Sequence, residues 1–114
     1  MRPRPRNKYG NRKVTVDGIT FDSEKEYCRW FELQLMQRAG IISELERQKQ
    51  FELQPGFYFK GHKRRPIFYV CDFFYKQEGN YIIEDVKSPV TANNQVYRLK
   101  KKMMEYRGYE VKEI

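Results

Sequence analysis

Hydrophobic and polar residues alternate in several short stretches of the chain, which is the pattern of β-strands. KVTVDGITF alternates around an Asp-Gly turn and predicts a hairpin over residues 13–21. FELQPGFYF predicts one bent strand or two short strands over residues 51–59, because a Pro-Gly pair interrupts it. IFYVCDFFY and NYIIEDVK predict two paired strands over residues 67–75 and 80–87, and YEVKEI predicts a closing strand over residues 109–114.

Two other segments repeat apolar residues every three or four positions, the spacing of one face of an α-helix. The first runs over residues 23–39, from a Ser-x-x-Glu capping pattern to a glycine stop. The second runs over residues 93–107 and also ends at a glycine. The residues predicted to face the core are Trp30, Phe31 and Leu35 in the first helix and Val96, Leu99, Met103 and Tyr106 in the second.

The predicted elements follow the order hairpin, helix, three strands, helix and strand. This order predicts an α/β fold in which two helices cover a mixed sheet. With 114 residues the chain has room for one hydrophobic core, so residues 13–114 are predicted to form a single domain. Residues 1–12 alternate Arg with Pro and contain little that can be buried, so they are predicted to form a flexible basic arm.

The composition favours a polyanionic partner. Lys and Arg total 23 against 15 Asp and Glu, and the net charge of +8 favours nucleic acid. No apolar run approaches a bilayer span and the N-terminus has no secretory pattern, so no membrane partner is expected and the chain is predicted to be cytoplasmic. Cys28 and Cys71 form no CxxC pair, so both are predicted to be buried and reduced rather than zinc ligands.

Charged side chains interrupt the two most apolar strands. Asp72 lies at the centre of YVCDFF, while Asp85 and Lys87 lie two residues apart in IIEDVK and therefore point to one face of the sheet. Buried charges are costly unless they are paired or bind a cation, and magnesium prefers carboxylate and water oxygens. Asp72 and Asp85 are therefore predicted to bind a hard divalent cation, with Lys87 beside the reacting phosphate. A register shift of one residue would exchange Asp85 for Glu84, and strand parity favours Asp85.

The order of elements and these charged positions resemble the PD-(D/E)XK nuclease superfamily, in which the second strand carries an Asp and the third carries (D/E)xK. The matching residues are Asp72 and Asp85-Val86-Lys87, although Cys71 stands where the superfamily has its Pro. The segments FDSEKEY and ERQKQFELQP, with the two strands, also resemble a family of small phage-encoded proteins catalogued as a domain of unknown function within that superfamily.

The resemblance implies a restriction-endonuclease-like core (αβββαβ) and a magnesium-dependent DNA endonuclease, with manganese as a substitute metal. It implies Glu26 as a third metal ligand beside Asp72 and Asp85, with Glu24 in reserve, and Lys87 as the fourth catalytic residue. A core of this size reads little sequence, so branched or junction DNA is the expected substrate. Small junction-resolving enzymes of the superfamily are homodimers, and a phage protein would act in the cytoplasm of its bacterial host.

Other interpretations of the same residues remain open at this point. Glu26 is also the expected partner of a helix cap, and Asp85 with Lys87 is also a pattern of exposed edge strands. Gln48 either braces the sheet or reaches the site. The alternative function is a noncatalytic module that binds DNA or RNA, in which the carboxylates only hold the fold together.

Basic residues in three regions are predicted either to contact DNA phosphates or to be simply solvated. They lie in the N-terminal arm, in GHKRRP, which is predicted to form a loop that contains the single histidine His62, and on the second helix. They are Arg4, Arg6, Lys8, Arg12, Lys13, Lys63, Arg64, Arg65, Arg98, Lys100 and Lys101. Tyr58, Tyr69 and Tyr75 are expected to pack in the core rather than to stack on bases.

Overall fold

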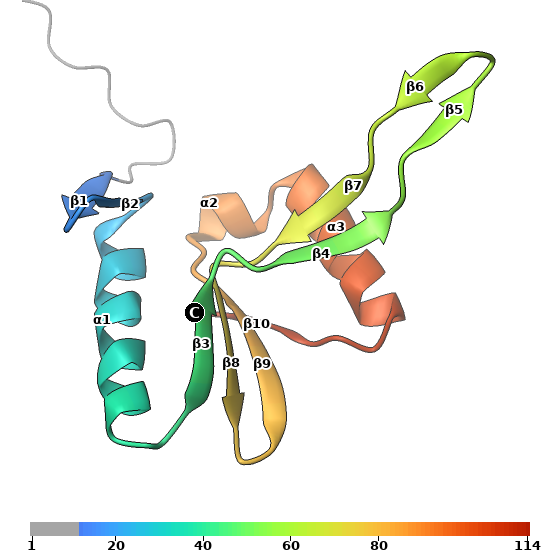
Figure 1. Cartoon of the computed structure of the whole chain (residues 1–114). Helices are drawn as coiled ribbons and strands as arrows, with labels where there is room; N and C mark the ends of the chain where they lie inside the picture. Colours follow the sequence, from blue (N-terminus) through green and yellow to red (C-terminus); the bar gives the residue numbers. More distant parts are fainter. Residues whose placement is uncertain (1–11) are drawn as a thin grey trace, which may run out of the picture.

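A mixed sheet of four strands forms the centre of the computed structural model, which describes residues 12–114 (Figure 1). The strand order is β10 (Val111–Glu113), β9 (Asn80–Asp85), β8 (Phe73–Gln77) and β3 (Ser43–Arg47). β9 pairs antiparallel with β8, and β8 with β3, while β10 is parallel to β9. A parallel neighbour needs a crossover connection, and the segment that contains α3 supplies it.

A helix covers each face of this sheet. α1 (Glu24–Arg38) packs on one face, and α3 (Gln95–Tyr106), preceded by the short α2 (Pro89–Ala92), packs on the other (Figure 1). Neighbouring strand residues point to opposite faces, so Phe73 joins the cluster beneath α1 and Phe74 the cluster beneath α3. The buried residues beneath α1 are Leu33, Ile42, Phe73 and Tyr75. Those beneath α3 are Leu53, Tyr69, Cys71, Phe74, Ile83, Met104 and Val111.

The remaining strands form three two-stranded ladders. β1 (Val14–Val16) and β2 (Ile19–Phe21) form the hairpin predicted for residues 13–21. β4 (Gln50–Gln54) pairs with β7 (Ile67–Val70), and β5 (Phe57–Phe59) pairs with β6 (His62–Arg64). With β3 and β8, these last two ladders make one long hairpin that is interrupted twice along its length (Figure 1).

The mixed α/β class, both long helices and the β8–β9 pairing agree with the sequence predictions. Residues 51–59 form two short strands, as one of the two alternatives stated. Two predictions were wrong, and one strand was missed. Residues 67–75 are not one strand but β7 and β8, separated at Cys71-Asp72; GHKRRP is not a loop, because residues 62–64 form β6; and β3 was not predicted at all.

The predicted inward faces of both helices were partly wrong. In α1, Phe31 is 53% exposed and Leu35 is 48% exposed, whereas Leu33 is fully buried. In α3, the residues of the predicted stripe that face solvent are Val96, Leu99 and Tyr106, with exposed fractions of 61%, 60% and 93%. Met104 is buried instead, with Tyr97 and Met103 partly buried beside it. Each helix carries two overlapping apolar stripes, and packing against the sheet selects one of them.

Two smaller expectations complete the comparison. Cys71 is buried as predicted, but Cys28 is exposed, and both thiols are free. Within residues 12–114, no helix combines the length and the apolar character that a membrane crossing requires. Residues 1–11, which carry Arg4, Arg6 and Lys8 of the predicted basic arm, lie outside the described part of the chain.

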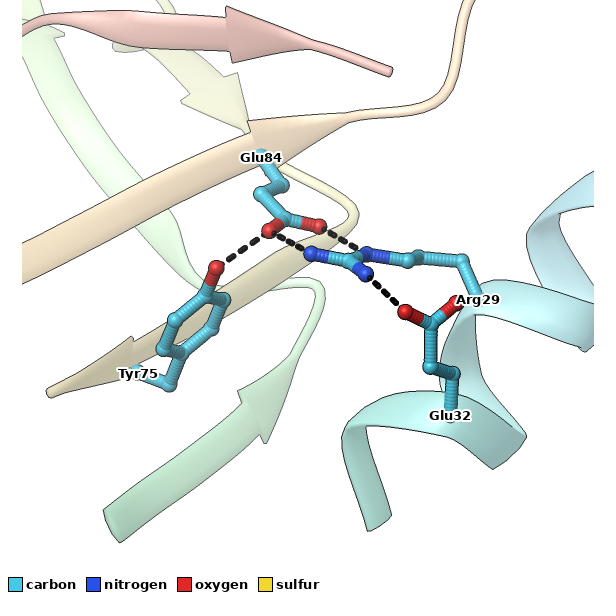
Figure 2. A network of polar contacts seen from close by, with 4 residues as sticks. All are labelled: Arg29, Glu32, Tyr75 and Glu84. Atoms are coloured by element: carbon cyan, nitrogen blue, oxygen red, sulfur yellow. Dashed lines mark hydrogen bonds and ion pairs between the residues drawn. The ribbon is translucent and has the colours of Figure 1, made fainter. Parts of the chain in front are cut away.

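A buried ion pair joins α1 to β9 (Figure 2). The Arg29 guanidinium donates from Nε and Nη2 to the two oxygens of Glu84, at 2.8 and 2.6 Å. Tyr75 donates its hydroxyl to the same carboxylate, and Arg29 also contacts Glu32 at 2.9 Å. Glu84 is 1% exposed, so its charge depends on these partners. The Glu84 hydrogen bond is the largest factor that raises the pKa of Arg29 above its ordinary value.

Removing one partner of this pair is expected to be much more costly than removing the exposed Glu32. Arg29→Ala leaves the Glu84 charge buried, and we expect it to lower the free energy of unfolding by about 3–5 kcal/mol. Glu32→Gln, at the 61% exposed end of the network, is the control and is expected to cost less than about 1 kcal/mol. Urea unfolding followed by circular dichroism measures both. If the two substitutions lowered the free energy of unfolding equally, the buried Arg29–Glu84 pair would not be important for stability.

Candidate functional site

The site lies where the long hairpin is broken between β7 and β8. The Cys71 amide donates to the Lys49 carbonyl at 3.1 Å, and the Gln48 amide donates to the Asp72 carbonyl at 3.0 Å. Gln48 adopts a positive φ of 52°, so the opposite strand also bends at this level. Of the two roles considered for Gln48, these backbone contacts support bracing of the sheet. The double bend places Asp72 at the end of the central sheet.

Asp72 and Asp85 are held together by reciprocal backbone contacts. The Asp72 amide donates to Asp85 Oδ1 at 3.0 Å and shares its proton with the Glu84 carbonyl at 3.1 Å. In return, the Val86 amide donates to Asp72 Oδ2 at 2.8 Å. The two carboxyl groups are close enough to hydrogen-bond when one of them is protonated. The predicted meeting of these two acids across the β8–β9 hairpin is therefore present in the structure.

Both acids are disfavoured as anions. Asp85 is 2% exposed, and burial, followed by repulsion from Asp72, raises its pKa to about 7, although the hydrogen bond from the Tyr69 hydroxyl opposes the rise. Burial likewise raises the pKa of Asp72, against the Val86 amide and the positive charge of Lys87, which lower it. A cation beside the pair would favour the ionised form of both.

Lys87 faces the same side of the sheet as Asp85. Its ammonium lies 4.3 Å from the centre of the Tyr97 ring on α3, and its charge lowers the pKa values of both aspartates. Val86, between them, packs into the cluster beneath α1. Glu84 also points toward α1, where it is occupied by Arg29, so the structure favours Asp85 over Glu84 as the partner of Lys87.

A groove runs from these residues between β7 and the α2–α3 segment. Its volume is about 360 Å³. Asp85 and Lys87 lie in its wall, and Lys100 from α3 lines the same groove. The remaining lining residues are Phe68, Tyr69, Val70, Thr91, Asn94, Val96 and Tyr97. An anionic chain lying in this groove would meet two ammonium groups beside a buried carboxylate.

Glu26 approaches the site from the first turn of α1. Its amide donates to Ser23 Oγ at 3.1 Å, while its carboxylate accepts from the Asp22 amide at 3.1 Å, so it takes part in the helix cap as one interpretation predicted. It is nevertheless 4% exposed, and burial together with repulsion from Asp72 raises its pKa to about 7. Glu24, the reserve candidate, is exposed. Glu26 is thus both a capping residue and a neighbour of the aspartate pair.

Arg47 and Tyr69 belong to the site but were not identified from the sequence. Arg47, on β3, lies 3.8 Å from Glu26 Oε1, stacks over the Phe21 ring at 4.5 Å, and has buried Nε and Nη2 atoms without hydrogen-bond partners among residues 12–114. Arg47 was not identified because its segment, SELER, does not have the pattern of a strand. Tyr69 lies in an apolar run and looks like a packing residue, so no pattern indicated its bond to Asp85.

The donors suit a magnesium ion. An ionised carboxylate offers about four lone pairs; the chain occupies two on Asp85 and one on Asp72, so both acids keep acceptor capacity. Magnesium is commonly bound by one or two carboxylates, with water and phosphate oxygens completing the octahedron. Within residues 12–114, no three His, Cys, Asp or Glu side chains are already grouped at metal-binding distance. The chain therefore offers two neighbouring carboxylates, with Glu26 adjacent as a third acid.

The predicted phosphate-binding residues are distributed unequally around this site. Arg12, Lys13 and Arg98 are exposed, and Lys100 lines the groove. Lys101 pairs with Glu113 at 2.5 Å, so its charge is already partly neutralised. The exposed residues Lys63, Arg64 and Arg65 lie on or beside β6, well away from the two aspartates along the long hairpin (Figure 1).

Comparisons with known proteins give one result. A search among curated proteins and a search among solved structures returned no significant match. One protein-family model, described as "Protein of unknown function (DUF1064)", matches residues 6–114. The match includes the long hairpin, both long helices and all the acids of the site, so the chain belongs to this DUF1064 family.

Proposed function

We propose that the protein is a magnesium-dependent endonuclease that hydrolyses phosphodiester bonds in DNA. One observation carries the proposal: the buried carboxylate of Asp85 and the half-buried carboxylate of Asp72 are held against each other, with Lys87 on the same face of the sheet. A structural ion pair needs no second acid, and two such acids side by side cost free energy unless a cation compensates them. A divalent cation and a phosphate would satisfy all three charges.

The order of elements supports the same proposal. α1, β3, β8, β9, α3 and β10 follow the sequence helix, three strands, helix and strand. The first aspartate directly precedes the second of these strands, and Asp85 ends the third, two residues before Lys87. We therefore propose that these elements form a restriction-endonuclease-like core of the PD-(D/E)XK type, and that Glu26 on α1 supplies its third acid.

Each side chain then has a definite task. When bound, magnesium supplies Lewis-acid activation of water and stabilises the negative charge that develops on the phosphate. Asp72 and Asp85 hold the cation, and Tyr69 fixes the orientation of the Asp85 carboxylate. Lys87 neutralises the phosphate and orients the attacking water. Arg47 holds Glu26 in place and keeps unused donors beside it.

The proposed substrate is branched DNA, and the proposed assembly is a homodimer. A catalytic core of this size has little surface for reading a long sequence, whereas backbone geometry can be read by phosphate contacts alone. Lys100 in the groove and the exposed Arg98 on α3 would provide such contacts next to the acids. Two symmetric cuts in a junction require two copies of the site, which a homodimer supplies.

A noncatalytic nucleic-acid-binding module is the second candidate. It is favoured by the hydrogen bonds that both oxygens of Asp85 already accept from the chain, because they show that the chain itself can stabilise this acid. In that case the acids would only fix the bend of the long hairpin. A divalent metal would then change DNA binding only by screening charges. Cleavage and metal binding therefore separate the two candidates.

Cleavage is expected to require magnesium and to depend on Asp85 and Lys87. On a labelled four-way junction, Asp85→Asn and Lys87→Ala should each lower the cleavage rate by roughly 10²–10³-fold, because each removes charge stabilisation at the reacting phosphate. Their dissociation constants for the junction, measured in EDTA, should stay within about threefold of the wild-type value. Flap and linear duplex DNA of equal length test the preference for branches.

Two exposed residues provide matched controls for charge. Glu78→Gln removes an acid in the β8–β9 turn, and Lys112→Ala removes a lysine from β10. Both variants should cleave at the wild-type rate. Metal-independent cleavage, or full activity of Asp85→Asn, would contradict the assignment of the site. Absence of cleavage on every substrate would favour the noncatalytic binding module.

The stability of the metal-free protein is expected to fall as the pH rises from about 5 to 7.5. Glu26 and Asp85 have pKa values of about 7, above their ordinary range, so in this interval the folded protein holds protons that the unfolded chain has released. The resulting loss should be on the order of 1–2 kcal/mol, since solvent screening reduces the ideal value. Asp85→Asn should flatten the trend in urea unfolding experiments.

Magnesium should reverse this loss at pH 7.5, because it binds the folded form alone. At ten times its dissociation constant, the ion should add about 1.4 kcal/mol to the free energy of unfolding. Asp85→Asn should abolish the gain, while Glu78→Gln should keep it. A gain that is the same in both variants would mean that magnesium acts elsewhere.

A further inference from the structure

The ribbon formed by β5 and β6 projects from the body beyond β4 and β7 (Figure 1). All six of its strand residues are exposed, and among residues 12–114 neither core cluster includes any of them. Tyr58 is 74% exposed, Phe59 52% and Phe57 43%. The expectation that Tyr58 packs in the core was therefore wrong. Three exposed aromatic side chains on one short ribbon require an explanation.

The chain separates this ribbon from the rest of the long hairpin. The last pair of the β4–β7 ladder is Gln54 with Ile67, and the first pair of the ribbon is Phe57 with Arg64. Pro55 and Pro66 interrupt the two strands between these pairs, because proline has no amide proton for a ladder.

The strands cross closely at this interruption. A Cβ atom at Gly56 would lie 3.2 Å from the Arg64 carbonyl oxygen and 3.2 Å from Pro66 Cδ, so the facing strand would crowd any side chain at this position. The ribbon is thus built as a distinct projection with its own fixed attachment.

The charge of this region has one sign. Between Glu52 and Asp72 the sequence contains no acidic residue, while Lys60, Lys63, Arg64 and Arg65 are all at or beside the ribbon. Such charges also discourage strand pairing at an exposed edge, but that role would not require exposed aromatic rings. Cations combined with exposed aromatic side chains match a nucleic acid, which offers phosphates and base edges together.

The two faces of the ribbon carry both kinds of side chain. Phe57 lies opposite Arg64 and Phe59 opposite His62, so these four share one face. Tyr58 and Lys63 lie opposite each other on the second face. A two-stranded ribbon fits the major groove of B-DNA, where phosphates flank both sides and apolar side chains contact thymine methyl groups.

The reach of the hairpin sets where such a contact would fall. From Asp72 to Arg64 the chain runs eight residues, and to Lys60 twelve, which is at most about 26 to 40 Å at about 3.3 Å per residue. The bends shorten this reach. Base pairs rise by about 3.4 Å, so the ribbon would meet a duplex about 7–10 base pairs from the aspartates, roughly one helical turn away.

We propose that the β5–β6 ribbon lies in the major groove of duplex DNA about 7–10 base pairs from the bond that is cut. The face that carries Phe57, Phe59 and Arg64 lies toward the bases, so the two rings contact base edges and Arg64 contacts a flanking phosphate. Lys63, on the second face, and Arg65 extend past the edge of the ribbon to the phosphates on either side. The distance to the cut rests on the proposed nuclease function, but binding by the ribbon does not require cleavage.

The test measures binding without cleavage, in EDTA, by fluorescence anisotropy with the full chain. Junctions with arms of 6 and of 14 base pairs are compared for the wild type and for Lys63→Ala/Arg64→Ala/Arg65→Ala. On long arms the ribbon variant should bind about 10–100-fold more weakly, and its slope of log affinity against log salt should fall by about 2–3. On short arms, which do not reach the ribbon, it should match the wild type.

A second variant and a control separate groove contact from simple loss of charge. Phe57→Ser/Phe59→Ser should weaken binding to long arms several-fold with an unchanged salt slope. Arg38→Ala/Lys76→Ala/Lys112→Ala removes the same charge from other elements and should stay within about threefold of the wild type. Circular dichroism checks that each variant is folded.

Several outcomes would overturn the ribbon proposal. The first is an unchanged affinity of the ribbon variant for long arms, and the second is an equal loss of affinity for short and long arms. The third is an equal loss of affinity for duplex RNA, whose narrow major groove excludes the ribbon. Conversion of a wild-type dimer into a monomer by the ribbon substitutions, measured by light scattering, would assign the ribbon to self-association instead. Length-dependent loss of binding without cleavage of any DNA would keep the ribbon proposal and remove the nuclease.

Discussion

The site depends on the backbone amide of Asp72, which donates to the carboxylate of Asp85 where the β7–β8 run is broken. The Val86 amide returns the contact to Asp72, so each acid is held by the backbone of the other's strand. Burial raises the pKa values of both acids, and repulsion from Asp72 adds to the rise for Asp85. The fold thus fixes a pair of carboxylates that is stabilised by protonation of one acid or by a bound cation.

The side chains of strand β9 alternate between a buried ion pair on one face of the sheet and the candidate site on the other. Glu84 points toward α1, where Arg29 and Tyr75 satisfy it (Figure 2). Asp85 points the other way, toward Tyr69 and the groove. Arg29 lies one helical turn after Glu26, so the buried ion pair also sets the position of Glu26 relative to the aspartates. Packing of α1 against the sheet therefore helps to position the acids of the candidate site relative to one another.

Local patterns predicted much of this arrangement but not its bends. The N-cap at Ser23, the Asp-Gly turn and the apolar runs of β8 and β9 are encoded by neighbouring residues, and they were found. Strand parity also placed Asp85 and Lys87 on one face. β3 was missed because Ser43–Arg47 is largely charged and becomes a strand only through pairing with β8. The break at Cys71-Asp72 and the contact of Arg47 with Glu26 depend on residues distant in sequence.

The same long hairpin connects the site to the ribbon, so the bend at Asp72 also sets the direction in which β5 and β6 project. In the proposed site, a divalent cation binds between Asp72 and Asp85. The most direct measurement is a titration of the ¹⁵N-labelled protein with Mn²⁺, followed by paramagnetic broadening of its amide signals. The account predicts that the Asp72 and Val86 amides broaden first, at substoichiometric Mn²⁺, and that excess Mg²⁺ restores them. Broadening that begins at exposed acids such as Glu78, or that leaves these two amides unchanged, would contradict it.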